Sequence, residues 1–200
     1  RSRPIPAGQV SIVQAATFLV VQALIGLAVL LQFNRFAIFC GVASLAIVAA
    51  YPFMKRITWW PQVVLGLAFS WGALMGFAAE FGRLDVIALL LYAGSISWVI
   101  GYDTIYAHQD AEDDALIGIK STALLFGAST KPALAVFYGL AVALIGAALW
   151  LAAVRWPAWI GLAAFAAHLV WQIQRLETGN SALCLRLFKA NRDAGLLLFA

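Results

Sequence analysis

Carboxylates gather in one short stretch of an otherwise apolar sequence. Of the nine acidic residues in the chain, five lie between positions 103 and 114: Asp103, Asp110, Glu112, Asp113 and Asp114. Carboxylates beside hydrocarbon are costly and are usually kept for a function. Close carboxylates repel one another, and a bound cation relieves that repulsion. Because Asp110 and Asp114 are four residues apart, a helix would place them on one face as two oxygen ligands for Mg²⁺, which completes its shell with water and phosphate oxygens.

The spacing of the acids predicts a carboxylate stripe on a single helix. Asp103 lies seven residues before Asp110, so we expect one helix to leave the membrane with Asp103, Asp110 and Asp114 along the same face. Asp113 is expected to share the metal-facing side, whereas Glu112 points elsewhere. The stretch lacks the clustered His and Cys ligands that zinc prefers. The pattern favours Mg²⁺ held by Asp110, Asp114 and Asp113, with a solvated acidic loop as the alternative.

The elements that position this stretch are predicted to be membrane helices. The 200 residues are 64% hydrophobic and 11% charged, whereas a soluble domain carries about 25% charge. Backbone groups in lipid must be satisfied internally, and about 20 residues of helix cross the hydrocarbon. The sequence therefore predicts an all-α integral membrane bundle, one domain over residues 1–200, with six full spans and the start of a seventh. The six apolar stretches are 12–31, 36–53, 62–82, 84–102, 132–154 and 157–174.

Basic residues alternate between the two sides of this predicted bundle. Ten of the 13 Lys and Arg residues fall on the side of the acidic stretch, and only Arg35, Arg83 and Arg155 fall on the other. The positive-inside rule places the ten-residue side in the cytoplasm. Topology thus accounts for the net charge of +4, and no nucleic acid partner is expected. The basic residues expected beside the acids, which suit a metal-bound anion such as a diphosphate, are Arg3, Lys55, Arg56 and Lys120.

A few other polar residues lie within or between the apolar stretches. Cys40 falls in an apolar stretch and Cys184 in a predicted polar loop, and their isolation predicts neither a disulfide nor a metal site. His168 and Gln172, one turn apart in 157–174, are expected to form hydrogen bonds between helices.

Several motifs resemble one known family. The run 102–127, YDTIYAHQDAEDDALIGIKSTALLFG, resembles the second aspartate-rich motif of the UbiA superfamily of intramembrane aromatic prenyltransferases. The runs 51–56, YPFMKR, and 61–66, PQVVLG, resemble the 4-hydroxybenzoate polyprenyltransferases of that superfamily. The run 3–8, RPIPAG, resembles the stretch after the family's first aspartate-rich motif, and 191–195, NRDAG, the entry to its last helix. The resemblance covers essentially the whole chain.

The resemblance implies a fold and an activity. The family's nine helices surround a cavity, and this chain would hold the third to eighth helices and the start of the ninth. We therefore interpret it as an internal stretch of a longer protein, expected to be inactive alone because the first acidic motif would precede Arg1. The implied reaction transfers a polyprenyl group from an all-trans polyprenyl diphosphate to the carbon ortho to the hydroxyl of 4-hydroxybenzoate, in ubiquinone biosynthesis. Mg²⁺ would be the cofactor, and the site would face the cytoplasm from a bacterial inner membrane.

The resemblance also assigns roles to individual residues. Asp110 and Asp114 match the pair that holds Mg²⁺ against the diphosphate. Asp113 lies in the same DxxDD motif, 110–114, and Asp103 matches a further catalytic acid. The residues matching substrate-binding positions are Tyr51 and Lys55 for the diphosphate, Arg56 for the benzoate carboxylate, and Lys120 for pairing with the acids or phosphate.

Three other functions are alternatives to prenyl transfer to 4-hydroxybenzoate. A related prenyltransferase could act on naphthoate, haem or chlorophyllide, which the runs at 51–56 and 61–66 disfavour. A cation-coupled transporter would need acids at mid-membrane and a broken helix. An intramembrane aspartyl protease would need a second acid within the spans besides Asp103.

Overall fold

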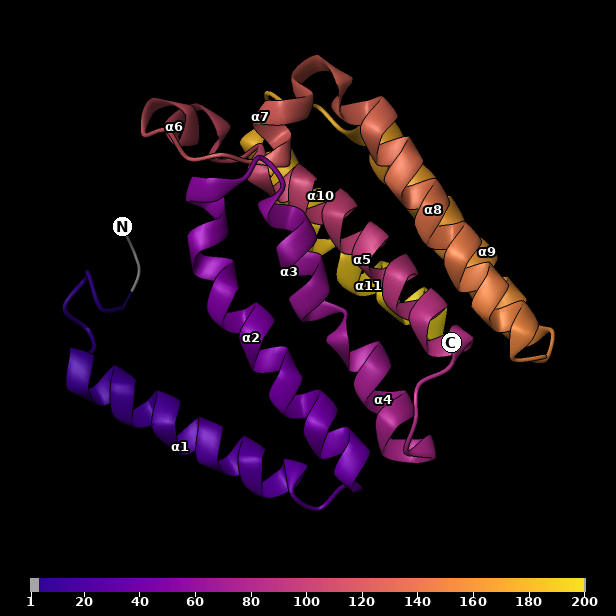
Figure 1. Ribbon diagram of the computed structural model, residues 1–200. Helices are drawn as coiled ribbons and strands as arrows, with labels where there is room; N and C mark the ends of the chain where they lie inside the picture. Colours follow the sequence, from indigo (N-terminus) through magenta and orange to yellow (C-terminus); the bar gives the residue numbers. More distant parts are fainter. Residues whose placement is uncertain (1–3, 200) are drawn as a thin grey trace.

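A computed structural model describes residues 4–199 of the chain (Figure 1). Every regular element in this range is helical, which confirms the all-α prediction. The elements are α1 (Ile12–Leu30), α2 (Arg35–Ile57), α3 (Pro61–Phe69), α4 (Trp71–Phe81), α5 (Val86–Ala107), α6 (Ala111–Leu116), α7 (Thr122–Phe126), the 3₁₀ turn η1 (Gly127–Ser129), α8 (Thr130–Leu151), α9 (Pro157–Arg175), α10 (Ser181–Lys189) and α11 (Asn191–Phe199).

Five segments of the described chain are long and apolar enough to cross a membrane. They are 12–30, 35–57, 61–81, 86–107 and 122–151, so α3 with α4 and α7 with α8 each count as one span. The predicted stretch 157–174 is helical as α9 but is not among the five, since it carries His168, Gln172 and Gln174. The count of six spans and the start of a seventh therefore stays a prediction.

Helix α5 lies at the centre of the bundle and packs against α3, α8 and α10. Its contact with α8 depends on glycine. A Cβ at Gly101 would overlap the ring of Tyr138, and one at Gly94 would lie 2.8 Å from Cγ1 of Ile145. Because small residues let helix backbones approach closely within a membrane, these two glycines fix α5 against α8.

A buried polar network ties the last helices to this centre. The Tyr138 hydroxyl donates to Oε1 of Gln172 at 2.9 Å, and Nε2 of Gln172 donates to Oδ1 of Asn191 at 3.1 Å. Nε1 of Trp98 donates to the same Asn191 oxygen at 2.8 Å, and His168 contacts Gln172 at 3.1 Å. The network joins α5, α8, α9 and α11, so the hydrogen bonds predicted between helices are confirmed at Gln172, whereas the bond of His168 lies within α9.

The predicted span 62–82 is broken at Ser70, where α3 ends and α4 begins. The hydroxyl of Tyr92 donates to the carbonyl of Leu67 at 2.8 Å, and Nε1 of Trp71 donates to the carbonyl of Cys40 at 3.1 Å. The first of these bonds satisfies backbone that the break frees, which a membrane protein requires.

The connection 175–193 is also more ordered than the sequence predicted. It contains the helix α10, and Cys184 lies on it with no exposed surface rather than in a polar loop. The apolar face of α10 packs into the main core cluster, and this packing explains the difference. Cys40 and Cys184 are both free thiols, as expected.

Candidate active site

The acidic stretch is divided between two helices, so the predicted single carboxylate stripe is wrong. Asp103 lies on α5, which ends at Ala107, while Asp110 is the N-terminal cap residue of α6. Between them, the amides of His108 and Gln109 donate hydrogen bonds to the carbonyls three residues earlier in the chain. The His108 ring bonds the Thr130 hydroxyl at 3.0 Å, which holds this turn against α8. A tertiary contact thus ends α5 at Ala107, whereas the spacing of the acids predicted that the helix would continue to Asp114.

The pair Asp110 and Asp114 keeps the predicted one-turn relation on α6. The Asp114 amide donates to the Asp110 carbonyl at 2.7 Å. Asp114 is buried, whereas Asp110 and Asp113 are exposed. Burial raises the pKa of the Asp114 carboxyl, Lys55 counteracts this, and repulsion by Asp110 and Asp113 raises the pKa further. The three carboxylates are therefore close enough to interact, which favours a bound cation.

Lys55 is the basic residue that faces both groups of acids. From the last turn of α2, its ammonium acts electrostatically on Asp103 of α5 and on Asp114 of α6. No ion pair within 4 Å joins Lys55 to either acid among the described residues. Tyr51, one turn earlier and half-buried, also lies near Asp103. Lys55 is therefore near both acids without a direct ion pair to either.

Lys120 is engaged with the end of α2 rather than with the acids. Its amide donates to the Lys55 carbonyl at 2.9 Å, and its Nζ donates to the Ile57 carbonyl at 3.2 Å. The same ammonium lies 5.7 Å from the centre of the Trp59 ring. Lys120 thus fastens α2 to the segment before α7, at the end of the bundle where Figure 1 shows α6.

The remaining predicted basic residues are Arg56 and Arg3, and the structure describes only Arg56. The side chain of Arg56 is exposed at the end of α2 and makes no hydrogen bond or ion pair to a described residue. Arg3 lies outside the described residues, as does the side chain of Glu112. Of the predicted cations, Lys55 is the one that the fold brings to the acids.

The acids of α6 fit a magnesium ion by their chemistry. Among the described side chains, no three His, Cys, Asp or Glu residues converge as a ready-made metal cage. Mg²⁺ does not need one, because one or two carboxylates together with water and phosphate oxygens suffice. Asp110 and Asp114 supply two such carboxylates, and their mutual repulsion favours a cation.

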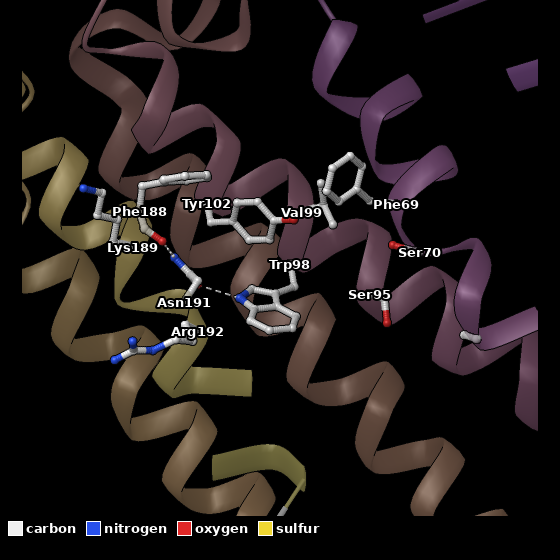
Figure 2. Close-up of a pocket in the computed structure, with 11 residues that line it drawn as sticks. Phe69, Ser70, Ser95, Trp98, Val99, Tyr102, Phe188, Lys189, Asn191 and Arg192 are labelled. Carbon is white, nitrogen blue, oxygen red and sulfur yellow. Dashed lines mark hydrogen bonds between the residues drawn. The ribbon is translucent and has the colours of Figure 1, made fainter. Parts of the chain in front are cut away.

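An apolar groove runs beside α5, the helix that carries Asp103. Its volume is about 480 Å³, and α3, α4, α5, α10 and α11 contribute its walls. Figure 2 shows Trp98, Tyr102 and Phe188 along it and the bond from Trp98 to Asn191. Ser70 is 6% exposed, and its hydroxyl is the single buried side-chain polar atom without a partner among residues 4–199. Because Tyr102 directly precedes Asp103, the groove follows the helix that carries the acid.

The residues that line this groove were not predicted from the sequence. The run 191–195 was noted for its resemblance, but not as part of a cavity wall. Asn191 and Arg192 at the start of α11 line the groove with Lys189 of α10. In the sequence, the polar residues of this run directly precede the apolar residues 196–198. That pattern could have indicated such a wall.

The family follows from comparison with known proteins. Residues 1–196 match the UbiA prenyltransferase family. The chain belongs to this family. It is 46% identical over 200 residues to the protein of Drosophila melanogaster named "4-hydroxybenzoate polyprenyltransferase, mitochondrial", covering 100% of this chain and 51% of that protein. It is 46% identical over 203 residues to the Homo sapiens protein of the same name, covering 99% of this chain and 54% of that protein. The chain thus spans about half the length of these curated relatives.

Two solved structures have the same fold. A UbiA homolog from Aeropyrum pernix K1 matches 98% of this chain and 74% of its own, with a TM-score of 0.83 and 24% identity. A digeranylgeranylglyceryl phosphate synthase matches 98% of this chain and 71% of its own, with a TM-score of 0.68 and 20% identity. At these identities the likeness concerns the fold.

Family membership also bears on the competing functions. A broken helix was expected of a transporter, and the span 61–81 does break at Ser70. The acids, however, lie on α5 and α6 and not on the broken helix. Membership of a prenyltransferase family therefore favours group transfer over transport or proteolysis.

Proposed function

We propose that this chain carries the diphosphate-binding part of an enzyme that transfers a polyprenyl group to 4-hydroxybenzoate. One observation carries the proposal: Lys55 faces Asp103 and Asp114 from a third helix, in a chain of the UbiA family. The names of the relatives from Drosophila melanogaster and Homo sapiens support the choice of acceptor. The reaction would serve ubiquinone biosynthesis.

The acids and Lys55 would act on the diphosphate end of the prenyl donor. Asp110 and Asp114, with Asp113 beside them, would hold Mg²⁺, which supplies positive charge to the leaving diphosphate. Lys55 would contact a phosphate oxygen, and Tyr51, one turn away, would donate a hydrogen bond to it. Charge placed in advance at the leaving group lowers the barrier to breaking the allylic C–O bond. In this scheme Lys120 keeps the end of α2 in place instead of contacting the phosphates.

The groove beside α5 would hold the apolar prenyl chain. Its walls are mainly apolar and aromatic, and they lie along the helix that carries Asp103. Such walls exclude the water that would otherwise capture a prenyl cation. The unpartnered hydroxyl of Ser70 offers one polar contact within the groove.

Arg56 would bind the acceptor. It follows Lys55 in α2, is exposed, and carries a guanidinium that can hold a carboxylate through two parallel hydrogen bonds. Such a clamp would orient 4-hydroxybenzoate so that the carbon ortho to its hydroxyl meets the prenyl carbon. The ring proton then leaves to a base.

The membrane placement is part of the same proposal. Six spans and the start of a seventh would cross the bilayer, with α9 counted among them. The end bearing Lys55 and α6 would face the cytoplasm, because most basic residues lie there. The predicted location in a bacterial inner membrane stays a prediction, since the relatives above are named as mitochondrial.

An acceptor panel tests the proposed substrate. The full-length protein in membranes is given a polyprenyl diphosphate, Mg²⁺ and either 4-hydroxybenzoate, a hydroxynaphthoate or haem. We expect prenylated 4-hydroxybenzoate as the main product. Prenylation of another acceptor at a higher kcat/KM would assign the chain to a different branch of the family.

A further inference from the structure

Helix α6, which carries the acids proposed to bind Mg²⁺, is too short to hold its own position. It has six residues, and Asp114 is the single buried side chain among those described in 110–118. An isolated helix of fewer than about 12 residues is marginal even when its sequence favours helix. The positions of Asp110 and Asp114 therefore depend on contacts at the two ends of α6.

The C-terminal end of α6 is anchored to α2. The Ile119 amide donates to the Asp114 carbonyl at 2.9 Å, and the next amide, that of Lys120, donates to the Lys55 carbonyl at 2.9 Å. The Lys120 ammonium adds a bond to the Ile57 carbonyl at 3.2 Å. These bonds fix where α6 ends, so the place where it begins needs an anchor of its own.

The N-terminal end of α6 is anchored by the side chain of His108. Its Nε2 lies 3.0 Å from the hydroxyl of Thr130, the first residue of α8 and 22 positions later in the chain. The neighbouring Gln109 amide donates to the Tyr106 carbonyl, which lies in the same turn. Among the described side chains of 107–111, His108 therefore makes the only hydrogen bond to another helix.

The direction of this bond follows from the second partner of Thr130. Its hydroxyl has one proton and donates it to the Gly127 carbonyl at 2.7 Å, because a carbonyl only accepts. The hydroxyl must then accept from His108, so Nε2 of the imidazole carries a proton. The amide nitrogen of glutamine is as many bonds from Cβ as Nε2 of histidine, so a glutamine at this position can make the same bond.

We propose that His108 is a positioning residue, which holds Asp110 and Asp114 in place for binding Mg²⁺; this role rests on the proposed function. Without the bond to Thr130, α5 is free to continue beyond its present end, as the spacing of the acids alone predicted. Asp110 would then extend α5 instead of starting a separate helix, and the pair would move relative to α2. His108 itself contacts neither metal nor substrate in this scheme.

Four variants and one control isolate the bond between His108 and Thr130. His108→Leu and Thr130→Val each remove the bond, from opposite sides of it. Thr130→Ser keeps the hydroxyl, and His108→Gln keeps an N–H donor although glutamine favours helix more than histidine does. Gln109→Met is the matched control, because it removes the local bond of the adjacent residue and leaves the bond between the helices in place.

A distance measurement tests the position of α6 without metal or substrate. Spin labels at Ala115→Cys on α6 and Trp156→Cys at the other end of the bundle occupy exposed positions of the full-length protein. Their distance distribution, from pulsed electron paramagnetic resonance, should shift or broaden in His108→Leu and Thr130→Val. It should match wild type in His108→Gln, Thr130→Ser and Gln109→Met. An unchanged distribution in either variant that removes the bond would overturn the proposal, whatever the protein catalyses.

Metal binding then separates positioning from simple packing. Groups that orient metal ligands are worth about 10- to 100-fold in metal affinity. We therefore expect the affinity for Mn²⁺, a paramagnetic substitute for Mg²⁺, to fall at least about tenfold in His108→Leu and Thr130→Val with inorganic pyrophosphate present. The double variant should lose no more than either single variant, since both remove the same bond. The KM for 4-hydroxybenzoate should stay within about twofold of wild type in all of them.

The outcomes distinguish this role from the proposed function. Normal Mn²⁺ affinity in a variant whose label distance has shifted would overturn the positioning role. A wild-type protein that binds no Mn²⁺ would refute the magnesium site and the role of His108 with it. A wild-type protein that binds Mn²⁺ but does not prenylate 4-hydroxybenzoate would refute the proposed acceptor alone and leave both the distance and the binding results standing.

Discussion

At the scale of single residues, Lys55 lies near acids that come from two different helices. It faces Asp103 on α5 and Asp114 on α6, and no ion pair with either acid is present in the described part of the chain. A lysine ammonium is a compact charge that can bind a phosphate oxygen. Lys55 is therefore the residue whose charge should matter most to a diphosphate leaving group.

Replacing Lys55 with Met should lower kcat about 100- to 1,000-fold, the usual cost of removing one group that stabilises a transition-state charge. The reason is loss of positive charge at the phosphate, so membrane insertion should be unaffected. Steady-state kinetics in membranes measures the effect. Lys131→Met is the control, because Lys131 is exposed on α8 outside the site; equal kinetics for the two variants would contradict the role of Lys55.

Arg56→Lys should raise the KM for 4-hydroxybenzoate about tenfold and leave the KM for the prenyl diphosphate nearly unchanged. Lysine keeps the charge but loses the planar fork that binds a carboxylate through two bonds. Kinetics with each substrate varied in turn measures both constants. A normal KM for 4-hydroxybenzoate would remove Arg56 from the acceptor site.

At the scale of elements, the close contact of α5 with α8 positions the acid-bearing helix. Gly101 leaves no room for a Cβ beneath the ring of Tyr138, whose hydroxyl belongs to the network with Gln172. Any side chain at Gly101 must push α8 away or break that hydrogen bond. The position of Asp103, two residues later, depends on the same contact.

Gly101→Ala should therefore destabilise the protein by about 1–3 kcal/mol, the usual cost of overpacking. Thermal unfolding in detergent measures the loss. Gly139→Ala is a matched control on α8, because a Cβ at Gly139 meets nothing within 4 Å. Equal stability of the two variants would show that α5 and α8 are not held by this contact.

The same elements show what the sequence could and could not predict. The helices and the acidic and basic runs are local in sequence, so hydrophobic length and residue spacing were enough to predict them. The end of α5 depends on the bond from His108 to Thr130, and the engagement of Lys120 depends on the Ile57 carbonyl. These contacts join residues far apart in the chain, and no local pattern encodes them. The groove wall formed by Asn191 was missed for the same reason.

At the scale of the whole molecule, the site lies at one end of the bundle. Figure 1 shows α6, α7 and the turn between α2 and α3 at the same end. Helix α1 buries none of its residues and runs apart from α5 and α8 in that view. The connection from α1 to α2, which ends at Arg35, and the connection from α8 to α9, which contains Arg155, lie at the opposite end in Figure 1. The proposed orientation predicts such a separation of charge along the bundle.

Single introduced cysteines test this orientation. Cys40 and Cys184 are 5% and 0% exposed, and burial raises the pKa of the Cys184 thiol, so it stays protonated and unreactive near neutral pH. Ala115→Cys on α6 should react with an impermeant maleimide only from the cytoplasmic side, and Trp156→Cys only from the other. Labelling of both from one side would contradict the topology.

The central claim is that the acids of α6 hold Mg²⁺ against a prenyl diphosphate so that its prenyl group passes to 4-hydroxybenzoate. The most direct measurement is the formation of prenylated 4-hydroxybenzoate by full-length protein in membranes, titrated with Mg²⁺, for wild type, Asp110→Ala, Asp114→Ala and the exposed-acid control Glu177→Gln. We predict product that requires Mg²⁺ in wild type and Glu177→Gln, and none in Asp110→Ala or Asp114→Ala despite normal membrane insertion. Wild-type turnover in either α6 variant, or turnover that ignores Mg²⁺, would contradict the account.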